Sequence, residues 1–384
     1  MSKKKPMIPF NKPFIVGKEL SYIAQAVLVE SRTAGDGSFT KKCHEWLEKR
    51  LGCKKALLTH SCTAALEMSA ILCDIGQGDE VIMPSFTFVS TANAFVLRGG
   101  VPVFVDIRPD TLNIDERLIE KAITPKTKAI VPVHYAGMSC EMDVIMALAE
   151  KHDLKVIEDA AQALLSTWKK QYLGTVGHLG CVSFHETKNI ISGEGGALLI
   201  NDERFVQRAE IIREKGTDRS RFFRGEVDKY TWQDIGSSYL PSELTAAFLF
   251  AQLEEAEKII AKRRNIYAQY LEFLKPLAQE GHIHIPPVSE DHEENGHLFY
   301  ILTGSLEERN ALMHHLQDGG IKAIFHYVPL HSSPAGKRLC RTSGTTSVTD
   351  EMSDRLLRLP LYYDMTEGDV GRVIERISKF YHSK

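Results

Sequence analysis

Between residues 55 and 200, short apolar runs alternate with stretches of helical periodicity. The expected strands are KALLTH (55–60), EVIMPS (80–85), VPVFVD (101–106), AIVPVHY (129–135), LKVIED (154–159), CVSFH (181–185) and GALLIND (196–202). Nearly continuous apolar strands separated by helices are typical of a mostly parallel sheet that is covered on both faces. We therefore predict an α/β protein with a mostly parallel seven-stranded sheet between helices. In such sheets ligands bind beyond the carboxyl ends of the strands.

The second half of the chain has a different rhythm. The helical stretch over residues 241–279 is longer than an ordinary helix, and we expect it to bend or break once. Fewer strand candidates follow it. We predict a large domain with an N-terminal arm over residues 1–250 and a smaller α+β domain over residues 251–384. The boundary is expected near residues 245–265.

Composition excludes several classes of function. The 384 residues carry a formal net charge of −3, which does not indicate a surface for nucleic acid, and no apolar segment approaches membrane-spanning length. The three lysines at positions 3–5 are not followed by an apolar signal core, so we interpret them as a solvated end. The seven cysteines include no Cys-x-x-Cys pair and fit reduced thiols better than disulfides or a zinc site. We expect a cytoplasmic protein without a metal.

Short motifs for other chemistries do not match. The glycine cluster at residues 193–196 lies before a strand, whereas a dinucleotide fingerprint follows a strand and opens a helix. The Gly-Asp-Gly at residues 35–37 lacks the third glycine of that fingerprint, and no Walker sequence occurs. His44 and His292 each precede a glutamate but lack the second histidine of a zinc protease helix. We interpret the glycines as turn formers, and nicotinamide and ATP chemistry remain minor alternatives.

Hydroxyl and aromatic side chains follow two of the expected strands. Residues 61–64 (Ser-Cys-Thr-Ala) open a helix after the strand at 55–60, and unpaired amides with hydroxyl groups at a helix start suit a phosphate. Phe88 follows the strand at 80–85, and its ring could stack on a planar ligand. A simple helix cap and ordinary core packing are the respective alternatives.

A carboxylate ends the strand at residues 154–159, and an amide follows it. Asp159 at the end of a buried strand is costly unless it is paired or caps a helix. If a helix begins here, Gln162 lies three residues later on the same face. Helix capping would explain Asp159 but gives no reason for Gln162. Ser183 lies within the next expected strand at 181–185, and Lys188 follows that strand, where a solvated lysine is the default interpretation.

Together these side chains match one cofactor, pyridoxal 5′-phosphate. A lysine forms a Schiff base with its aldehyde, and a carboxylate pairs with its pyridine nitrogen. The carboxylate keeps that nitrogen protonated, so the ring can accept electrons when a proton leaves the adjacent carbon. In this interpretation Lys188 anchors and activates the aldehyde, and Gln162 hydrogen-bonds the ring hydroxyl.

Motifs along nearly the whole chain resemble a known family. They are SCTAAL, PSFTFVSTANA, FVDI, VPVHYAG, VIEDAAQA, SFHETKN, GEGG and PLH, between IPFNKP and the last helix. In this order they resemble the sugar-nucleotide aminotransferases of the DegT/StrS type, which are fold-type-I pyridoxal phosphate enzymes. The stretches GDGSFT, IIREKGT, FFRG, DKYTW and DIGSSYL resemble the branch that aminates dTDP-linked 4-keto-6-deoxy sugars.

The resemblance implies a role for individual residues. Lys188 is the Schiff-base lysine and proton shuttle, and Asp159 pairs with the pyridine nitrogen. Gln162 meets the ring hydroxyl, and Phe88 stacks on the ring. The residues implied to hold the phosphate are Cys62, Thr63, Ala64 and Ser183.

Two departures from the family pattern concern the same cofactor. Many relatives have glycine at the position of Cys62, and cysteine disfavours positive φ, so this loop either avoids that conformation or carries strain. Many relatives have an asparagine within the segment equivalent to residues 236–240, where it reaches the phosphate of the neighbouring subunit. The resemblance implies that Ser238 makes a shorter version of that contact.

His331, in PLH, is implied as a contact to the nucleotide sugar, with a structural histidine as the alternative.

The resemblance also implies a ping-pong reaction in a homodimer with shared active sites. L-Glutamate supplies the amino group, and the 4-keto group of dTDP-4-dehydro-6-deoxy-D-glucose accepts it for surface polysaccharide biosynthesis. Galacto and gluco products both stay open, as do other nucleotide-sugar 4- or 3-aminotransferases. A sugar dehydratase on the same scaffold and a non-catalytic regulator are further alternatives. Such dehydratases have histidine in place of the Schiff-base lysine, so Lys188 argues against the first of these.

Overall fold

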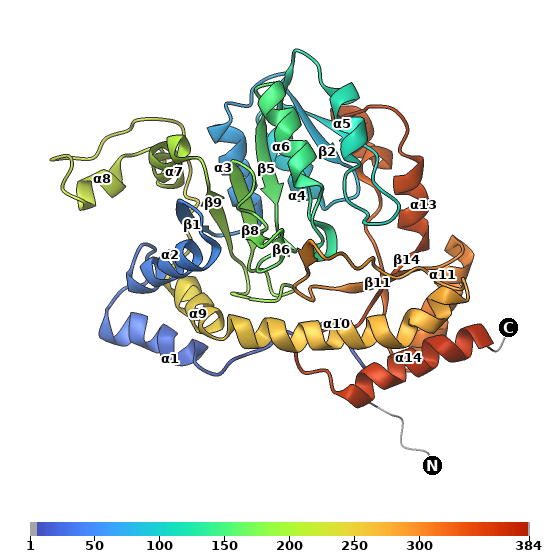
Figure 1. Cartoon of the computed structure of the whole chain (residues 1–384). Coiled ribbons are helices and arrows are strands. Elements are labelled where there is room, and N and C mark those ends of the chain that lie inside the picture. The colour runs from blue at the N-terminus through green and yellow to red at the C-terminus, as the bar shows by residue number, and fades with distance from the viewer. Residues whose placement is uncertain (1–5, 383–384) are drawn as a thin grey trace.

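A computed structural model describes residues 6–382 and is built around an eight-stranded sheet (Figure 1). The strand order is β1-β9-β8-β5-β4-β2-β3-β13. The bounds are β1 (Lys55–Thr59), β2 (Glu80–Pro84), β3 (Val101–Val105), β4 (Thr127–Ile130), β5 (Lys155–Asp159), β8 (Leu179–Ser183), β9 (Gly196–Ile200) and β13 (Arg341–Thr342). Only β9 runs antiparallel to its neighbours, β1 and β8. The mostly parallel α/β sheet is confirmed, and the two-residue β13 extends it. The lysines at positions 3–5 lie outside the described residues.

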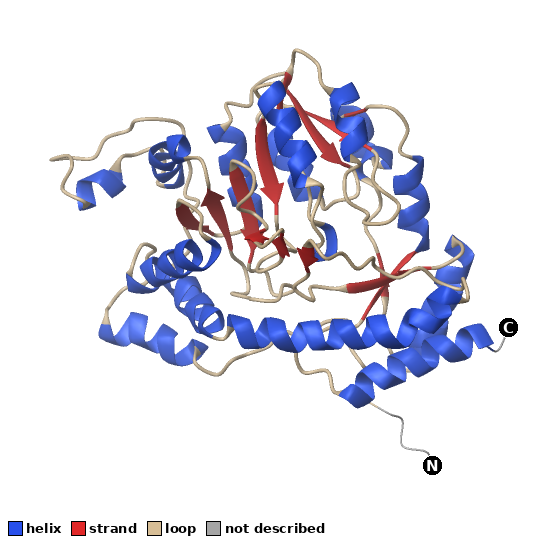
Figure 2. Ribbon diagram, in the orientation of Figure 1, coloured by secondary structure: helices blue, strands red, loops and turns tan. Residues whose placement is uncertain are grey.

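Helices cover both faces of this sheet, as Figure 2 shows. Side chains of β1 alternate between the two faces, with Ala56 and Leu58 in one apolar cluster and Leu57 in the other. The first face is covered by α2 (Ser38–Leu51), α5 (Glu116–Ala122), α6 (Met142–Lys151) and α9 (Glu243–Glu254). The second is covered by α3 (Cys62–Leu72), α4 (Val89–Val96) and α7 (Val206–Arg213). Burial on both faces explains why the strands read as continuous apolar runs.

The long helical stretch after residue 241 breaks once, as predicted. The helix α9 ends at Glu254, and α10 (Ala256–Gln279) begins after Glu255, whose φ of −105° and ψ of 10° are not helical. A second, antiparallel sheet follows, made of β11 (Phe299–Leu302), β14 (Leu356–Leu359) and β12 (Ile324–Phe325). It packs in its own apolar cluster with α10, α11 (Leu306–Asp318) and α14 (Glu367–His382).

The remaining elements are short. They are α1 (Glu19–Ala24), a π-helix η1 (Gln25–Val29), η2 (Tyr135–Gly137), β6 (Thr167–Trp168), β7 (Gln171–Tyr172), η3 (Glu203–Phe205), α8 (Arg219–Phe223), β10 (His292–Glu293), η4 (Leu330–Ser332), α12 (Pro334–Leu339) and α13 (Ser347–Arg355). Among residues 6–382, no helix combines the length and the apolar content needed to cross a membrane.

Residues on each side of the predicted boundary at residue 250 pack with elements of the other side. Ile8 pairs with Ile321 and is buried in the C-terminal apolar cluster. In return, β13 pairs with β3 of the large sheet. The division into domains of residues 1–250 and 251–384 stays a prediction.

Candidate active site

A cavity of about 480 Å³ opens where β1, β2, β5 and β8 end. Its volume is in the range of sites for small molecules. Seven of the predicted site residues line it: Cys62, Thr63, Phe88, Asp159, Gln162, Ser183 and Lys188. Parallel strands bring their carboxyl ends to one edge of the sheet, and this explains why segments distant in sequence meet here. Three predicted residues, Ala64, Ser238 and His331, are not part of the lining.

The start of α3 forms one wall of the cavity. The Ser61 hydroxyl caps this helix by accepting a hydrogen bond of 3.1 Å from the backbone N–H of Ala64. The backbone N–H groups of Cys62 and Thr63 have no acceptor among residues 6–382. Two free amides at a helix N-terminus fit a phosphate, and Ser183 adds a hydroxyl from the end of β8. Ala64 is buried with its amide engaged, so it contributes to the helix cap and does not face the cavity.

Cys62 does not adopt the positive φ that would strain a cysteine at this position. It is the first residue of α3 and has no positive φ. Burial raises the pKa of its thiol well above the usual range. The side chain therefore stays uncharged beside a site suited to an anion.

The carboxylate of Asp159 is held in one orientation. Its Oδ2 accepts a hydrogen bond of 2.7 Å from the Thr91 hydroxyl, and its Oδ1 accepts one of 3.1 Å from the backbone N–H of Ala161. The Thr91 hydroxyl also lies 2.8 Å from the Thr87 hydroxyl. Since the single hydroxyl hydrogen of Thr91 is directed to Asp159, Thr87 must donate to Thr91. Sequence reasoning missed Thr91, because a threonine inside a helix carries no distinctive signal.

Gln162 lines the cavity from a turn, whereas the sequence allows a helix at this position. Residues 161–165 form turns and not a helix, and Leu165 with a φ of 66° would interrupt helical geometry. The Gln162 Oε1 accepts a hydrogen bond of 2.7 Å from the Ala136 N–H. Its Nε2 has no acceptor among the described residues, which leaves it free to donate to a ligand oxygen.

The ε-amine of Lys188 has no hydrogen-bond or ion-pair partner within residues 6–382. Burial lowers its pKa below the usual value, although Cys62 and Asp159 act in the opposite direction. The following residue anchors the loop, because the Asn189 amide donates to the Asn295 carbonyl at 2.9 Å. The lowered pKa favours the uncharged form of the amine, and this form acts as a nucleophile toward an aldehyde.

An aromatic wall from the C-terminal half completes the cavity. His326 stacks on Phe86 with ring centroids 3.8 Å apart, and its Nδ1 lies 3.1 Å from the Tyr135 hydroxyl. The Nε2 of His326 is buried without a partner among the described residues. Tyr327 lies 5.2 Å from the half-exposed ring of Phe88. No local pattern in the sequence marks His326 or Tyr327, since they reach the site only through tertiary packing.

His331 and Ser238 lie outside this constellation. The Nδ1 of His331 is 2.8 Å from the Ser85 hydroxyl, and its Nε2 is 3.0 Å from the Thr346 hydroxyl. Both ring nitrogens thus have protein partners, which favours the structural alternative for this histidine. Ser238 is exposed and forms an isolated antiparallel bridge with Glu214.

The arrangement combines a free lysine amine, an oriented carboxylate, a free amide and a helix N-terminus at the strand ends of an α/β sheet. These features define a pyridoxal phosphate enzyme of fold type I. The chain belongs to the DegT/DnrJ/EryC1/StrS aminotransferase family, whose profile matches residues 16–378. It is therefore an aminotransferase that uses pyridoxal 5′-phosphate.

Similar proteins are known from several bacteria. The spore coat polysaccharide biosynthesis protein SpsC of Bacillus subtilis (strain 168) is 31% identical over 385 residues, which cover 98% of each chain. DesV of S. venezuelae, solved in complex with a ketimine intermediate, is 29% identical, with a TM-score of 0.88 over 98% of this chain and 99% of DesV. An aminotransferase from Psychrobacter cryohalolentis is 27% identical, with a TM-score of 0.91 over 98% of this chain and 99% of that chain.

Proposed function

We propose that the chain is a dTDP-4-amino-4,6-dideoxygalactose transaminase. It converts dTDP-4-dehydro-6-deoxy-D-glucose and L-glutamate to dTDP-4-amino-4,6-dideoxy-D-galactose and 2-oxoglutarate. The observation that carries the proposal is the unpaired amine of Lys188 in a cavity with an oriented Asp159. The motif SFHETKN, which contains Lys188, and the motif GDGSFT at residues 35–40 resemble this enzyme and support the choice of sugar. The product serves a surface polysaccharide such as enterobacterial common antigen or O-antigen, and the name of the relative SpsC supports a polysaccharide pathway.

Different cavity residues hold different parts of the cofactor. Asp159 pairs with the ring nitrogen, Gln162 donates to the ring hydroxyl, and Phe88 covers a ring face. The free amides of Cys62 and Thr63, with the Ser183 hydroxyl, hold the phosphate. Pyridoxal phosphate, when bound, supplies the electron sink and carries the amino group between the two substrates.

Lys188 performs the proton transfers. Its ε-amine removes the proton from the α-carbon of glutamate and delivers a proton to C4 of the sugar. A base must be unprotonated near neutral pH, and burial, which lowers the pKa of Lys188, supports this role. The sugar face that Lys188 approaches determines galacto or gluco configuration.

We also propose a cytoplasmic homodimer with shared active sites. An arm that includes α8 projects from the body of the subunit in Figure 1. It exposes large apolar side chains, with Phe223 67% and Trp232 82% accessible. Such exposure is typical of an association surface. Ser238 follows this arm and would reach the cofactor phosphate of the partner subunit. The cytoplasmic location is proposed on the cysteine pattern described above.

Product analysis tests the substrate assignment. Purified protein, yellow with its cofactor, is incubated with L-glutamate and dTDP-4-dehydro-6-deoxy-D-glucose, and the product is examined by NMR. A galacto product has an axial amine at C4 and a small coupling between H3 and H4. A large coupling would identify the gluco isomer and overturn the named product. Bleaching by glutamate without turnover of this sugar would assign the chain to another sugar of the family.

A lysine variant tests the mechanism independently. Lys188→Ala is expected to abolish amino transfer and to retain the native circular dichroism spectrum. Reduction of the wild type with borohydride should attach the cofactor to the peptide that contains Lys188. Transfer at the wild-type rate by the variant would refute the role of this residue.

A further inference from the structure

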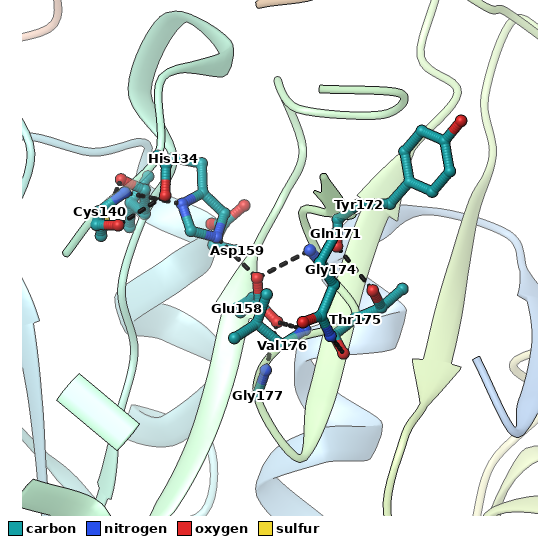
Figure 3. A network of polar contacts seen from close by, with 12 residues as sticks. His134, Cys140, Glu158, Asp159, Gln171, Tyr172, Gly174, Thr175, Val176 and Gly177 are labelled. Carbon is teal, nitrogen blue, oxygen red and sulfur yellow. Dashed lines mark hydrogen bonds and ion pairs between the residues drawn. The ribbon is translucent and has the colours of Figure 1, made fainter. Parts of the chain in front are cut away.

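A second carboxylate lies beside the first on β5. Glu158 is completely buried, and it is not part of the cavity lining, because neighbouring residues of a strand point to opposite faces. Figure 3 shows how its two oxygens are held. Its hydrogen-bond donors are the backbone N–H groups of Val176 (2.8 Å) and Gly177 (2.6 Å) on Oε1, and the Gly174 N–H (2.7 Å) and His134 Nε2 (2.8 Å) on Oε2. Glu158 acts as an acceptor in all four bonds, as an ionised carboxylate does.

The tautomer of His134 is fixed by its other ring nitrogen. The Nδ1 accepts a hydrogen bond of 3.2 Å from the backbone N–H of Cys140. The ring proton must therefore be on Nε2, where it is donated to Glu158. His134 is completely buried, so no water competes for either nitrogen.

The backbone of the same histidine runs beside the end of β5. The His134 N–H donates to the Asp159 carbonyl at 3.1 Å, and the Asp159 N–H donates to the Pro132 carbonyl at 2.9 Å. Two residues further on, the Ala136 N–H holds the Gln162 side chain. Glu158 thus joins β5, the segment 132–136 and the loop 174–177 directly behind the cavity.

We propose that Glu158, acting through His134 and the loop 174–177, is a positioning residue that holds Asp159 in place for the ring nitrogen of the cofactor. This inference rests on the proposed role of Asp159. Small displacements of a catalytic group are expensive, because a shift of about 1 Å can reduce a rate by about two orders of magnitude. A fixed strand end is therefore as necessary as the carboxylate that it carries.

Glutamine cannot replace Glu158 without disturbing its hydrogen bonds to His134 and to the loop 174–177. A carboxylate offers two acceptor oxygens to four donors, whereas an amide offers one oxygen and two further N–H groups. Either orientation of Glu158→Gln places an NH₂ against N–H donors. His134 cannot relieve the conflict by changing its tautomer, since its Nδ1 would then face the Cys140 N–H. We expect the strand end to move and Asp159 to lose its alignment.

The test compares pyridoxal phosphate with its 1-deaza analogue, in which a C–H group replaces the ring nitrogen. Dissociation constants of both are measured by fluorescence titration of the full-length apoprotein. The wild type should bind the natural cofactor about 10- to 100-fold more tightly, because only this ring makes a charge-assisted hydrogen bond to Asp159. In Glu158→Gln this ratio should fall to within about threefold of unity. An unchanged ratio in Glu158→Gln would overturn the positioning role.

Two control variants separate the possible failures. Glu243 is also completely buried and accepts hydrogen bonds from three backbone N–H groups and one hydroxyl, but it is not in the cavity lining. Glu243→Gln should lower stability by a similar amount and leave the ratio unchanged; a reduced ratio here would show that loss of stability alone explains the effect. Asp159→Asn should abolish the preference. If it does not, the proposed role of Asp159 fails, whereas failure in Glu158→Gln alone refutes only the present inference.

Substitution of His134 tests the hydrogen bond between His134 and Glu158 if Glu158→Gln does not fold. His134→Gln retains an N–H that can reach Glu158, and we expect it to keep most of the ratio. His134→Leu removes that donor and should reduce the ratio about tenfold. Equal ratios in the two variants would contradict a role for the His134–Glu158 bond.

Discussion

At the scale of single residues, the amine of Lys188 links stability to pH. Burial lowers its pKa from the usual 10.5, so the unfolded chain binds more protons between the lowered value and 10.5. The stability of the apoprotein therefore rises with pH across this window. Below the window, the partly buried ammonium destabilises the fold by about 1.4 kcal/mol for each unit of pKa shift.

A neutral replacement should reveal this effect. We expect Lys188→Met to make the apoprotein more stable than the wild type at pH 7, and the difference should shrink as pH rises toward 10.5. Urea denaturation of both proteins at several pH values measures the difference in the free energy of unfolding. A difference independent of pH would mean that the Lys188 pKa is not lowered by folding.

Thr91 offers a second prediction at this scale. Thr91→Val keeps the shape of the side chain but removes the donor to Asp159, so the affinity for pyridoxal phosphate should fall about tenfold, as expected for one bond to a charged group. Thr40→Val is the matched control, since the Thr40 hydroxyl is equally buried and donates to the distant carboxylate of Glu243. We expect the control to lose stability without losing cofactor affinity. Comparable affinities in Thr91→Val and the wild type would argue against this contact.

At the scale of elements, the segment before β11 joins the C-terminal half to the cavity. The Asn295 side-chain amide donates to the backbone carbonyls of Gln162 and Leu164, both at 2.9 Å, and the Asn295 backbone carbonyl accepts from the Asn189 side chain. The next residue, Gly296, is held by the guanidinium of Arg263. One short segment therefore supports the residues beside both Lys188 and Asp159.

Gly296 is the sensitive position of this segment. Its φ is +62°, and a Cβ there would lie 2.7 Å from the backbone of Arg263. Gly296→Ala should destabilise the protein by about 2 kcal/mol or more and slow amino transfer. Gly281→Ala is the control, because Gly281 has a φ of +79° but open space around its Cα; strain alone should lower stability there by about 1 kcal/mol. Equal losses in thermal denaturation would show that the close approach to Arg263 is unimportant.

Elements differ in how far the sequence determines them. The strands β2 and β8 are buried along their whole length, so an apolar run was sufficient to predict each of them. The strand β13 has two residues, of which Arg341 pairs with Glu80, and such a short polar pair leaves no periodic pattern. The helix considered after Asp159 is absent, and residues 161–165 form turns, because tertiary contacts override the helix propensity of alanine and glutamine there.

The residues of the candidate site also differ in how far the sequence predicts them. Asp159 is the last residue of β5, Gln162 lies three residues beyond it, and Lys188 lies five residues beyond the end of β8. The rule that the carboxyl ends of parallel strands meet is enough to group these residues. The aromatic side chains of His326 and Tyr327 arrive from a segment about 140 residues beyond Lys188, and only the packed structure brings them to the cavity. His331 was selected by resemblance, but its neighbours engage both ring nitrogens.

At the scale of the whole molecule, the arm around α8 should control assembly. Trp232 is 82% accessible in the single subunit, and a charge there would be unfavourable only if another surface covers it. We expect Trp232→Asp to shift the protein from dimer to monomer in sedimentation experiments and to reduce activity at low protein concentration. Phe273→Asp is the control, since Phe273 is 53% accessible on the distant α10. A monomeric wild type, or a Trp232→Asp variant that stays dimeric, would contradict this arrangement.

The pairing of Ile8 with Ile321 has a consequence for biosynthesis. The Ile8 N–H donates to the Gly320 carbonyl, and the Lys322 N–H donates to the Ile8 carbonyl. The partner segment leaves the ribosome more than 300 residues after Ile8, which is a delay of roughly 15 to 60 s at ordinary translation rates. During this interval the nascent polypeptide carries an apolar segment without its final partner, so this pairing forms only when synthesis is nearly complete.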